Sequence, residues 1–170
     1  MLKPDRFFAS VERIQPPVLR EMGVRALIVD LDNTLLPRDR DTVPASVREW
    51  LRAMAEDGLP VCLVSNNWHR RARETAHELG IPIVAKAIKP LPFAFLRALR
   101  ILGVRPRECV VIGDQLFTDV LGGRLVGCRT VMVPPQSSHD LPHTLLLRRL
   151  ESLIMGRSAA DRAQEESSCG

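Results

Sequence analysis

Residues 26–34 read Ala-Leu-Ile-Val-Asp-Leu-Asp-Asn-Thr and hold the pattern that decides the fold of this chain. The four apolar residues at its start predict a short strand without a polar face, the type found in parallel sheets that are covered on both sides. Ligands of such sheets collect beyond the carboxyl ends of the strands, and the carboxylates of Asp30 and Asp32 stand directly after this strand. The same residues also suit an ordinary turn. The rest of the sequence has to decide between a turn and a site.

Strand and helix patterns alternate along the remainder of the chain. Short apolar runs predict strands, and most are followed by about ten residues with apolar side chains at helical spacing. The expected strands are 24–29, 61–64, 83–85, 109–112 and 130–133, and the expected helices are 44–57, 68–79, 92–102 and 120–126. This alternation is typical of repeated βαβ units. We therefore expect a single α/β domain of the Rossmann type, with a parallel sheet of about five strands and helices on both faces.

The composition is that of an ordinary globular protein, with 45% hydrophobic and 26% charged residues. No apolar run approaches the roughly 18 residues of a membrane span, and the first residues lack the apolar core of a secretory signal. The four cysteines form no Cys-x-x-Cys pair and fit reduced thiols in a cytoplasmic protein. Arginines are scattered without interleaved aromatics, so nucleic acid is not an expected partner. Of the 24 basic residues, only Lys3, Lys86 and Lys89 are lysines. A lysine beside a candidate site therefore suggests a specific role for its ammonium group.

Polar side chains follow four of the predicted strands. In chain order they are Asp30, Asp32, Ser65, Asn66, Lys89, Asp114 and Asp119. Because right-handed crossovers bring the carboxyl ends of parallel strands to one edge of a sheet, we expect these side chains to gather. The acids suit a hard divalent cation, whereas the hydroxyl and the lysine suit an anion. The predicted ligand is therefore a phosphate group held against Mg²⁺.

These clusters resemble, in order and content, the four motifs of the haloacid dehalogenase superfamily. They are most similar to its small capless branch, the YqeG-like and phosphatidylglycerophosphate phosphatase family. The likeness extends from Phe8 to about Leu150, nearly the whole chain. The segments that carry it are Asp30–Thr34, Ser65–Asn67, Lys89-Pro90 and Gly113–Asp119. The resemblance implies a Mg²⁺-dependent phosphatase with a Rossmann-like domain and no cap domain.

The resemblance also implies a role for each motif residue. It implies Asp30 as nucleophile, Asp32 as general acid and base, Lys89 as charge stabiliser, Ser65, Asn66 and Thr34 as phosphate-binding residues, Asp30, Asp32 and Asp114 as Mg²⁺ ligands, and Asp119 in support. Thr34 is expected to bond within its turn. Arg124 stands where the family pattern has asparagine, after a pair of glycines.

The chemistry of these residues can be argued without the family. A phosphate monoester and a carboxylate repel each other, so attack by Asp30 needs Mg²⁺ and an ammonium group to offset the charge. Attack would give an aspartyl-phosphate, which divides one difficult displacement into two easier ones. Asp32 would give a proton to the leaving alkoxide and later take one from the hydrolytic water. We predict Lys89 rather than Lys86 as the ammonium because of the proline that follows it and its place in the loop.

The substrate is suggested by the short gaps between the motifs. Each gap holds one helix with its connections, which leaves no room for a cap domain. An open site suits a phosphate carried on something large, such as a lipid headgroup at an anionic membrane surface. On family likeness we favour the conversion of phosphatidylglycerophosphate to phosphatidylglycerol over hydrolysis of a sugar phosphate or a nucleotide. The expected location is the cytoplasm, with the inner face of the membrane as a peripheral docking surface.

Two terminal segments bear on this membrane hypothesis. In residues 1–23, Phe7, Val11 and Ile14 fall at helical spacing before Pro16-Pro17, and Leu145–Met155 carries leucines at helical spacing among arginines. Each fits either a helix packed on the domain or a basic segment resting on anionic lipid. We expect residues 1–23 to flank a phosphatase domain over 24–157, followed by a disordered tail at 158–170.

Two alternatives were considered. A signalling receiver domain, a non-catalytic phosphate-accepting module, also has an acid pair after its first strand, but it accepts phosphate on an acid after its third strand. Here the third strand, 83–85, is followed by no acid. His139 and His143 are four residues apart, but Pro142 interrupts any helix there and no third ligand is evident, so a zinc site is not expected. The sequence does not predict an oligomeric state.

Overall fold

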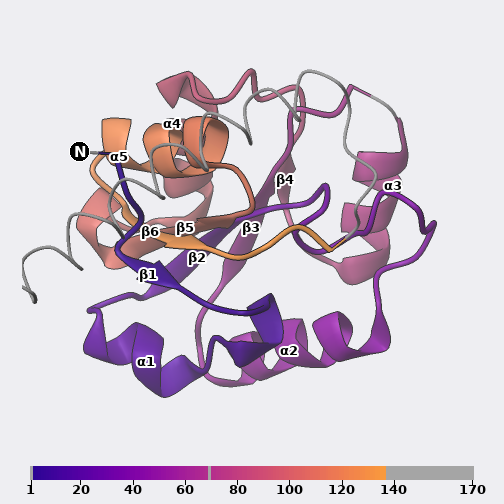
Figure 1. Cartoon of the computed structure of the whole chain (residues 1–170), viewed down its shortest axis with the longest axis horizontal. Helices are drawn as coiled ribbons and strands as arrows, with labels where there is room; N and C mark the ends of the chain where they lie inside the picture. The colour runs from indigo at the N-terminus through magenta and orange to yellow at the C-terminus, as the bar shows by residue number, and fades with distance from the viewer. Residues whose placement is uncertain (1, 69, 137–170) are drawn as a thin grey trace, which may run out of the picture. The chain divides into compact units, whose positions relative to one another are not determined.

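The computed structural model describes residues 2–68 and 70–136, and a parallel sheet of six strands lies at the centre of this part of the chain (Figure 1). The strands are β1 (Arg6–Phe7), β2 (Ala26–Asp30), β3 (Val61–Val64), β4 (Ile83–Val84), β5 (Cys109–Gly113) and β6 (Arg129–Met132). Their order across the sheet is β1-β6-β5-β2-β3-β4, and every neighbouring pair is parallel. Strands β3 and β4 therefore lie on one side of β2, and strands β5, β6 and β1 lie on the other. Ligands of open α/β sheets bind at such a point, just beyond the strand ends.

Helices cover both faces of the sheet, as predicted. They are α1 (Pro16–Glu21), α2 (Ala45–Glu56), α3 (Arg70–Leu79), α4 (Pro92–Leu102) and α5 (Leu121–Leu125). Figure 1 shows α1 and α2 on one side of the strands and α4 and α5 on the other. The apolar core is divided in the same way, with one buried cluster that includes residues of α1, α2 and α3 and a second that includes residues of α4.

The sequence of β2 explains why it lies in the middle. All five of its residues are buried. Leu27 and Val29 belong to the core cluster beneath α2, whereas Ile28 belongs to the cluster beneath α4. Successive strand residues point to opposite faces, so a strand without polar positions can be covered on both sides. The prediction of a buried parallel strand is confirmed, but the strand spans Ala26–Asp30 where 24–29 was predicted.

The first 23 residues differ from the predicted amphipathic helix. Arg6–Phe7 forms the edge strand β1, which pairs with β6, and helix α1 begins at Pro16, where we had expected a helix to break. Proline fits the first turn of a helix because no intrahelical hydrogen bond is needed there. Val11 and Ile14 are buried in the core, whereas Phe7 is exposed. Two of the three apolar positions of this segment therefore belong to the domain core.

None of the helices in the described residues is long and apolar enough to cross a membrane. The Leu145–Met155 segment, the His139 and His143 pair and the tail at 158–170 lie outside the described residues.

Candidate active site

The predicted site residues stand at the carboxyl edge of the sheet. Asp30 is the last residue of β2, and β2 lies between β3 and β5. Ser65 follows β3 directly, Asp114 follows β5 directly, and Lys89 lies in the loop between β4 and α4. Parallel strands end at the same edge, so side chains from four segments of the chain converge above β2.

A buried lysine occupies the centre of this site. The Lys89 Nζ atom donates hydrogen bonds to Asp30 Oδ1 at 2.5 Å and to Asp119 Oδ1 at 2.6 Å. The Lys89 side chain is 4% exposed, and the two carboxylates are equally buried. Taking an ammonium group out of water is costly, and two charge-assisted hydrogen bonds offset that cost.

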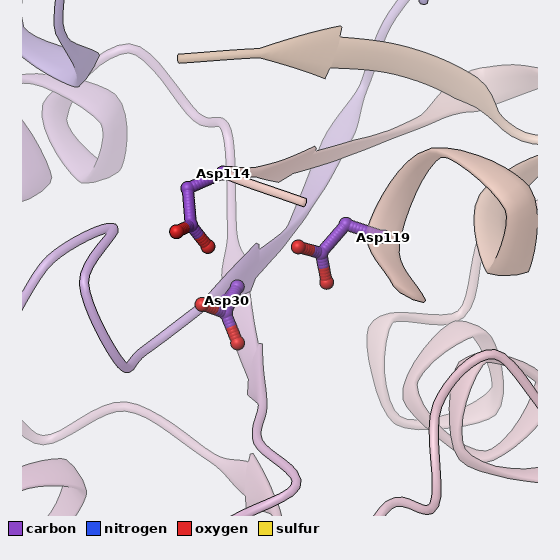
Figure 2. A group of neighbouring side chains, drawn as sticks. All are labelled: Asp30, Asp114 and Asp119. Atoms are coloured by element: carbon purple, nitrogen blue, oxygen red, sulfur yellow. The ribbon is translucent and has the colours of Figure 1, made fainter. Parts of the chain in front are cut away.

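Three carboxylates face one another beside this lysine. One oxygen each from Asp30, Asp114 and Asp119 lies within 4.8 Å of the other two, and Figure 2 shows the three side chains pointing into a common space. When all three are ionised, the single ammonium of Lys89 leaves two negative charges uncompensated. Carboxylate oxygens at this spacing suit a hard divalent cation.

The Asp32 side chain lies outside this group. We predict that Asp30, Asp32 and Asp114 hold the metal, whereas the carboxylates that face one another in the structure are those of Asp30, Asp114 and Asp119. The Asp32 carboxylate accepts hydrogen bonds from Ser65 Oγ at 2.6 Å and from the Asn67 side-chain amide at 3.1 Å. The turn after β2 thus directs two acids that are one residue apart to different neighbours.

The electrostatics of the group follow from its burial. Burial raises the pKa of the Asp30 carboxyl well above its ordinary value, and the Lys89 ammonium opposes this shift. Burial alone would lower the pKa of Lys89, but the carboxylates of Asp119 and Asp30 raise it above its ordinary value. Lys89 therefore carries its proton at neutral pH. A positive charge fixed between the two acids keeps Asp30 closer to its ionised form than burial alone would allow.

Asp119 reaches Lys89 because of the local backbone after β5. Residues Leu116–Val120 form one turn of π-helix, and the Asp119 Oδ2 atom accepts a hydrogen bond from the Gln115 backbone N–H at 3.2 Å. The Asp119 carboxylate packs directly on the Cα of Gly113, where a Cβ would collide with it. Glycine is required here because the two groups approach so closely.

We predict that Gly113→Ala lowers turnover about 100-fold, because the added methyl group displaces Asp119 from Lys89. The matched control is Gly80→Ala, where φ is 66° and nothing lies within 4 Å of the added Cβ. That control should cost about 1 kcal/mol of stability and leave turnover unchanged. Turnover and urea unfolding measured on both variants check this, and an equal loss of turnover in the control would contradict it.

Asn66 contacts the loop that carries Lys89, and its predicted binding of phosphate stays a prediction. Its side-chain Oδ1 accepts a hydrogen bond from the Lys89 backbone N–H at 2.6 Å, and its Nδ2 donates to the Lys89 carbonyl at 3.4 Å. The side chain therefore holds the loop that carries Lys89. The neighbouring Asn67 was missed by sequence reasoning. Its backbone N–H donates to Ser65 Oγ at 2.9 Å, in addition to its contact with Asp32.

The remaining predicted residues lie apart from the carboxylate group. Thr34 is fully buried, its carbonyl accepts a hydrogen bond from Gln136 Nε2 at 2.6 Å, and it lines a cavity of about 300 Å³ together with Ser10 and Arg40. Lys86 Nζ lies 4.9 Å from the centre of the Trp68 ring. Of the two lysines considered, Lys89 is the one in contact with the carboxylates.

Comparison with known proteins decides the family. Residues 37–127 match the family model of haloacid dehalogenase-like hydrolases. Over 152 residues the chain is 43% identical to a Bacillus subtilis protein described as "Probable phosphatase YqeG", covering 89% of this chain and 88% of that protein. The chain belongs to the haloacid dehalogenase-like hydrolase family. It is a phosphatase of that family, and the receiver-domain alternative is wrong. An alignment that covers 89% of the chain necessarily includes the segment from Asp30 to Asp119.

Two further proteins extend the comparison. The chain is 26% identical over 156 residues to phosphatidylglycerophosphate phosphatase 1 of Arabidopsis thaliana, covering 82% of this chain and 43% of that protein. The fold matches that of the cobalt-bound deoxy-D-mannose-octulosonate 8-phosphate phosphatase of Haemophilus influenzae, with a TM-score of 0.54 and 17% identity over 66% of this chain and 69% of that one. The described residues form the domain of this family without a cap domain.

Proposed function

We propose that this phosphatase hydrolyses phosphatidylglycerophosphate to phosphatidylglycerol, with Mg²⁺, through an aspartyl-phosphate on Asp30. The observation that carries the proposal is the contact of Lys89 Nζ with Asp30 Oδ1 beside two further carboxylates. An ammonium group at this distance offsets the negative charge of an incoming phosphate monoester while leaving the second Asp30 oxygen to attack.

The residues present fit Mg²⁺. The donors in the group are all carboxylate oxygens, which this small hard cation prefers. Asp30 and Asp114 would hold the ion, and Asp119 would support them from beside Lys89, whose ammonium contacts both Asp30 and Asp119. Mg²⁺ would supply charge neutralisation for the phosphoryl group at the moment of attack.

The chain's own residues would carry both chemical steps. In the first, an Asp30 oxygen forms a bond to phosphorus while the bond from phosphorus to the alcohol oxygen breaks, and Asp32 gives its proton to that oxygen. In the second, Asp32 takes a proton from water, which attacks phosphorus and releases Asp30 with inorganic phosphate. Ser65 and Asn67 donate hydrogen bonds to the Asp32 carboxylate, which keep it outside the charged group.

A divalent cation should also stabilise the fold. At about a hundredfold excess over its dissociation constant, we expect Mg²⁺ to raise the melting temperature by about 5 °C, because it neutralises buried like charges. Asp114→Asn should abolish this rise. Asp32→Asn should retain it, since the Asp32 carboxylate lies outside the group. Thermal melts with Mg²⁺ and with EDTA measure the effect, and an undiminished rise in Asp114→Asn would place the cation elsewhere.

The choice of a lipid substrate is supported by two findings. One of the relatives is described as a phosphatidylglycerophosphate phosphatase. In addition, the connection after β2 spans only residues 31–44 and those after β3, β4 and β5 are shorter, so no inserted domain covers the carboxylates in the described residues. We propose that the membrane surface presents the headgroup to this open site, which makes the protein a peripheral enzyme of the inner face.

The decisive assay compares phosphate release from phosphatidylglycerophosphate in mixed micelles with release from a panel of sugar phosphates and nucleotides. We expect the lipid to have the highest kcat/KM, and EDTA to remove the activity. Micelles of phosphatidylglycerol serve as the product control. A soluble monoester with a higher kcat/KM than the lipid would contradict the proposed lipid substrate but would leave the phosphatase activity unaffected.

A further inference from the structure

Exposed apolar side chains are concentrated in two segments, the loop after β3 and residues 88–96, which include Lys89. Among the described residues, eight large apolar side chains are exposed, and five of them belong to residues 68–96. Phe93 is 73% exposed and Trp68 is 64% exposed. We call the set the apolar rim; it comprises Trp68, Ile88, Leu91, Phe93 and Leu96. Single exposed leucines are common, but five together on adjoining segments indicate a surface that something covers.

The apolar rim is continuous with the active site. Ile88 and Leu91 flank the Lys89-Pro90 pair in the chain, and the Leu91 N–H donates to the Ile88 carbonyl at 3.0 Å, which closes a turn around the lysine. Trp68 is tied to the same loop through the Lys86 ammonium over its ring. Lys89 points inward to the carboxylates while its neighbours face solvent. A surface pressed against the apolar rim would therefore lie directly beside the reacting groups.

The backbone supports an outward role for Ile88. This residue adopts a φ of 53°, in the left-handed region that β-branched side chains rarely occupy. Its side chain is nonetheless 56% exposed, so contacts within the domain do not explain why an isoleucine stands there. Conformations of this cost are found where function requires them.

The exposed charges on the segment that carries most of the apolar rim have one sign. No acidic residue occurs between Glu78 and Glu108, although the chain has 20 acids. The exposed basic residues of the loop before α4 and of α4 itself are Lys86, Arg97 and Arg100. On α4, Phe93 and Leu96 share the exposed face with Arg97 and Arg100, at helical spacing. Apolar and aromatic side chains among exposed basic residues are typical of surfaces that rest on anionic lipid.

From this continuity and this charge we propose that the apolar rim inserts into the surface of an anionic bilayer, and so places the headgroup phosphate of a lipid at Lys89. The inference rests on the proposed lipid phosphatase function. It assigns membrane docking to the loop before α4 and to the first turns of that helix, rather than to the terminal segments 1–23 and 145–155. The phosphate of a lipid held at this surface needs to travel only past the Ile88–Leu91 turn to reach the carboxylates.

Tryptophan fluorescence tests the insertion directly in the full chain. Trp50 is buried and donates from Nε1 to the Ile14 carbonyl at 2.8 Å, so its emission stays constant, whereas the exposed Trp68 reports on the apolar rim. Vesicles of phosphatidylglycerol should shift the emission to the blue, and vesicles of phosphatidylcholine should shift it less. Trp68→Phe should remove the shift. An unchanged spectrum on phosphatidylglycerol vesicles at low salt would overturn the proposal.

A double variant tests whether docking to the membrane is needed for turnover of the lipid. Phe93→Ser combined with Leu96→Ser should weaken cosedimentation with phosphatidylglycerol vesicles at least about tenfold, because two large side chains no longer enter the bilayer. Hydrolysis of long-chain phosphatidylglycerophosphate in vesicles should fall by a similar factor. Hydrolysis of a short-chain, dispersed form should be unchanged. The control is Leu125→Ser, which removes an exposed leucine at the end of α5, near the amino edge of the sheet.

The outcomes separate this proposal from the function beneath it. If the wild type binds vesicles through the apolar rim but releases no phosphate from the lipid, the docking proposal is supported and phosphatidylglycerophosphate is not the substrate. If the double variant hydrolyses vesicle lipid as fast as the wild type, the proposed substrate is supported and the docking proposal is wrong. Docking is also overturned if the double variant changes only the oligomeric state in light scattering, which would indicate that a second copy covers the apolar rim.

Discussion

Asp30→Asn is expected to lower turnover by at least about 10⁴-fold while the protein remains folded. An amide does not attack phosphorus, so the covalent route is lost. The amide oxygen can still accept a hydrogen bond from Lys89, and Asp119 still balances the ammonium charge, so the fold keeps its central contacts. Phosphate release under saturating Mg²⁺ gives the rate, and circular dichroism with a thermal melt gives the state of the fold.

The control for Asp30 is Asp39→Asn, which makes the same chemical change at an exposed aspartate. It should keep the wild-type rate. Undiminished release by Asp30→Asn would rule out covalent catalysis at that residue, whatever the family resemblance implies. A melt showing an unfolded Asp30→Asn variant would mean that the carboxylate is needed for folding instead, and Asp30→Ala at lower temperature would then separate the two roles.

Lys89→Met is expected to abolish turnover and to destabilise the protein by about 3–5 kcal/mol. The side chains are similar in shape, but the change leaves Asp30 and Asp119 buried without the ammonium that both contact. Burial then raises the pKa of the Asp30 carboxyl without the opposing effect of the Lys89 ammonium. Because the folded-state pKa of Asp30 exceeds its unfolded value, the folded variant binds more protons. Its stability should therefore fall as pH rises through the range where Asp30 ionises, which urea unfolding at several pH values measures.

The matched control for Lys89 is Lys86→Met, three residues earlier in the same loop. Lys86 lies over the Trp68 ring and away from the carboxylates, so this variant should hydrolyse a soluble monoester within about twofold of the wild-type rate. Equal losses in both variants would show that the loop, and not one ammonium group, is what matters. Full activity in Lys89→Met would contradict its role as charge stabiliser.

The main strands could be predicted because each is a short apolar run that is buried on both faces. β1 could not be predicted in this way, since Arg6–Phe7 is two exposed residues long and is defined by pairing with β6 rather than by an apolar pattern. The start of α1 at Pro16 was missed for a related reason. A proline marks either the end of one helix or the first turn of the next, and only packing against the core decides between them.

The site could be predicted as a set of residues but not in its detailed contacts. Strand ends placed Asp30, Lys89 and Asp114 correctly at one edge of the sheet. The partner of each side chain depended on turn geometry that no residue pattern reports. The sequence therefore did not show that Asp119, and not Asp32, faces Asp30 and Asp114. The helix predicted over 68–79 begins only at Arg70, so Trp68 precedes it and is exposed.

Trapping the intermediate tests the central claim most directly. Wild-type protein mixed with Mg²⁺ and substrate is quenched within a fraction of a turnover and treated with borohydride, which reduces an aspartyl-phosphate to homoserine. Mass spectrometry of the peptide that contains Asp30 then locates the modified residue. We predict homoserine at position 30, dependent on substrate and Mg²⁺ and missing from Asp30→Asn. Reduction at another aspartate, or turnover with no reduced residue at any quench time, would contradict phosphoryl transfer to Asp30.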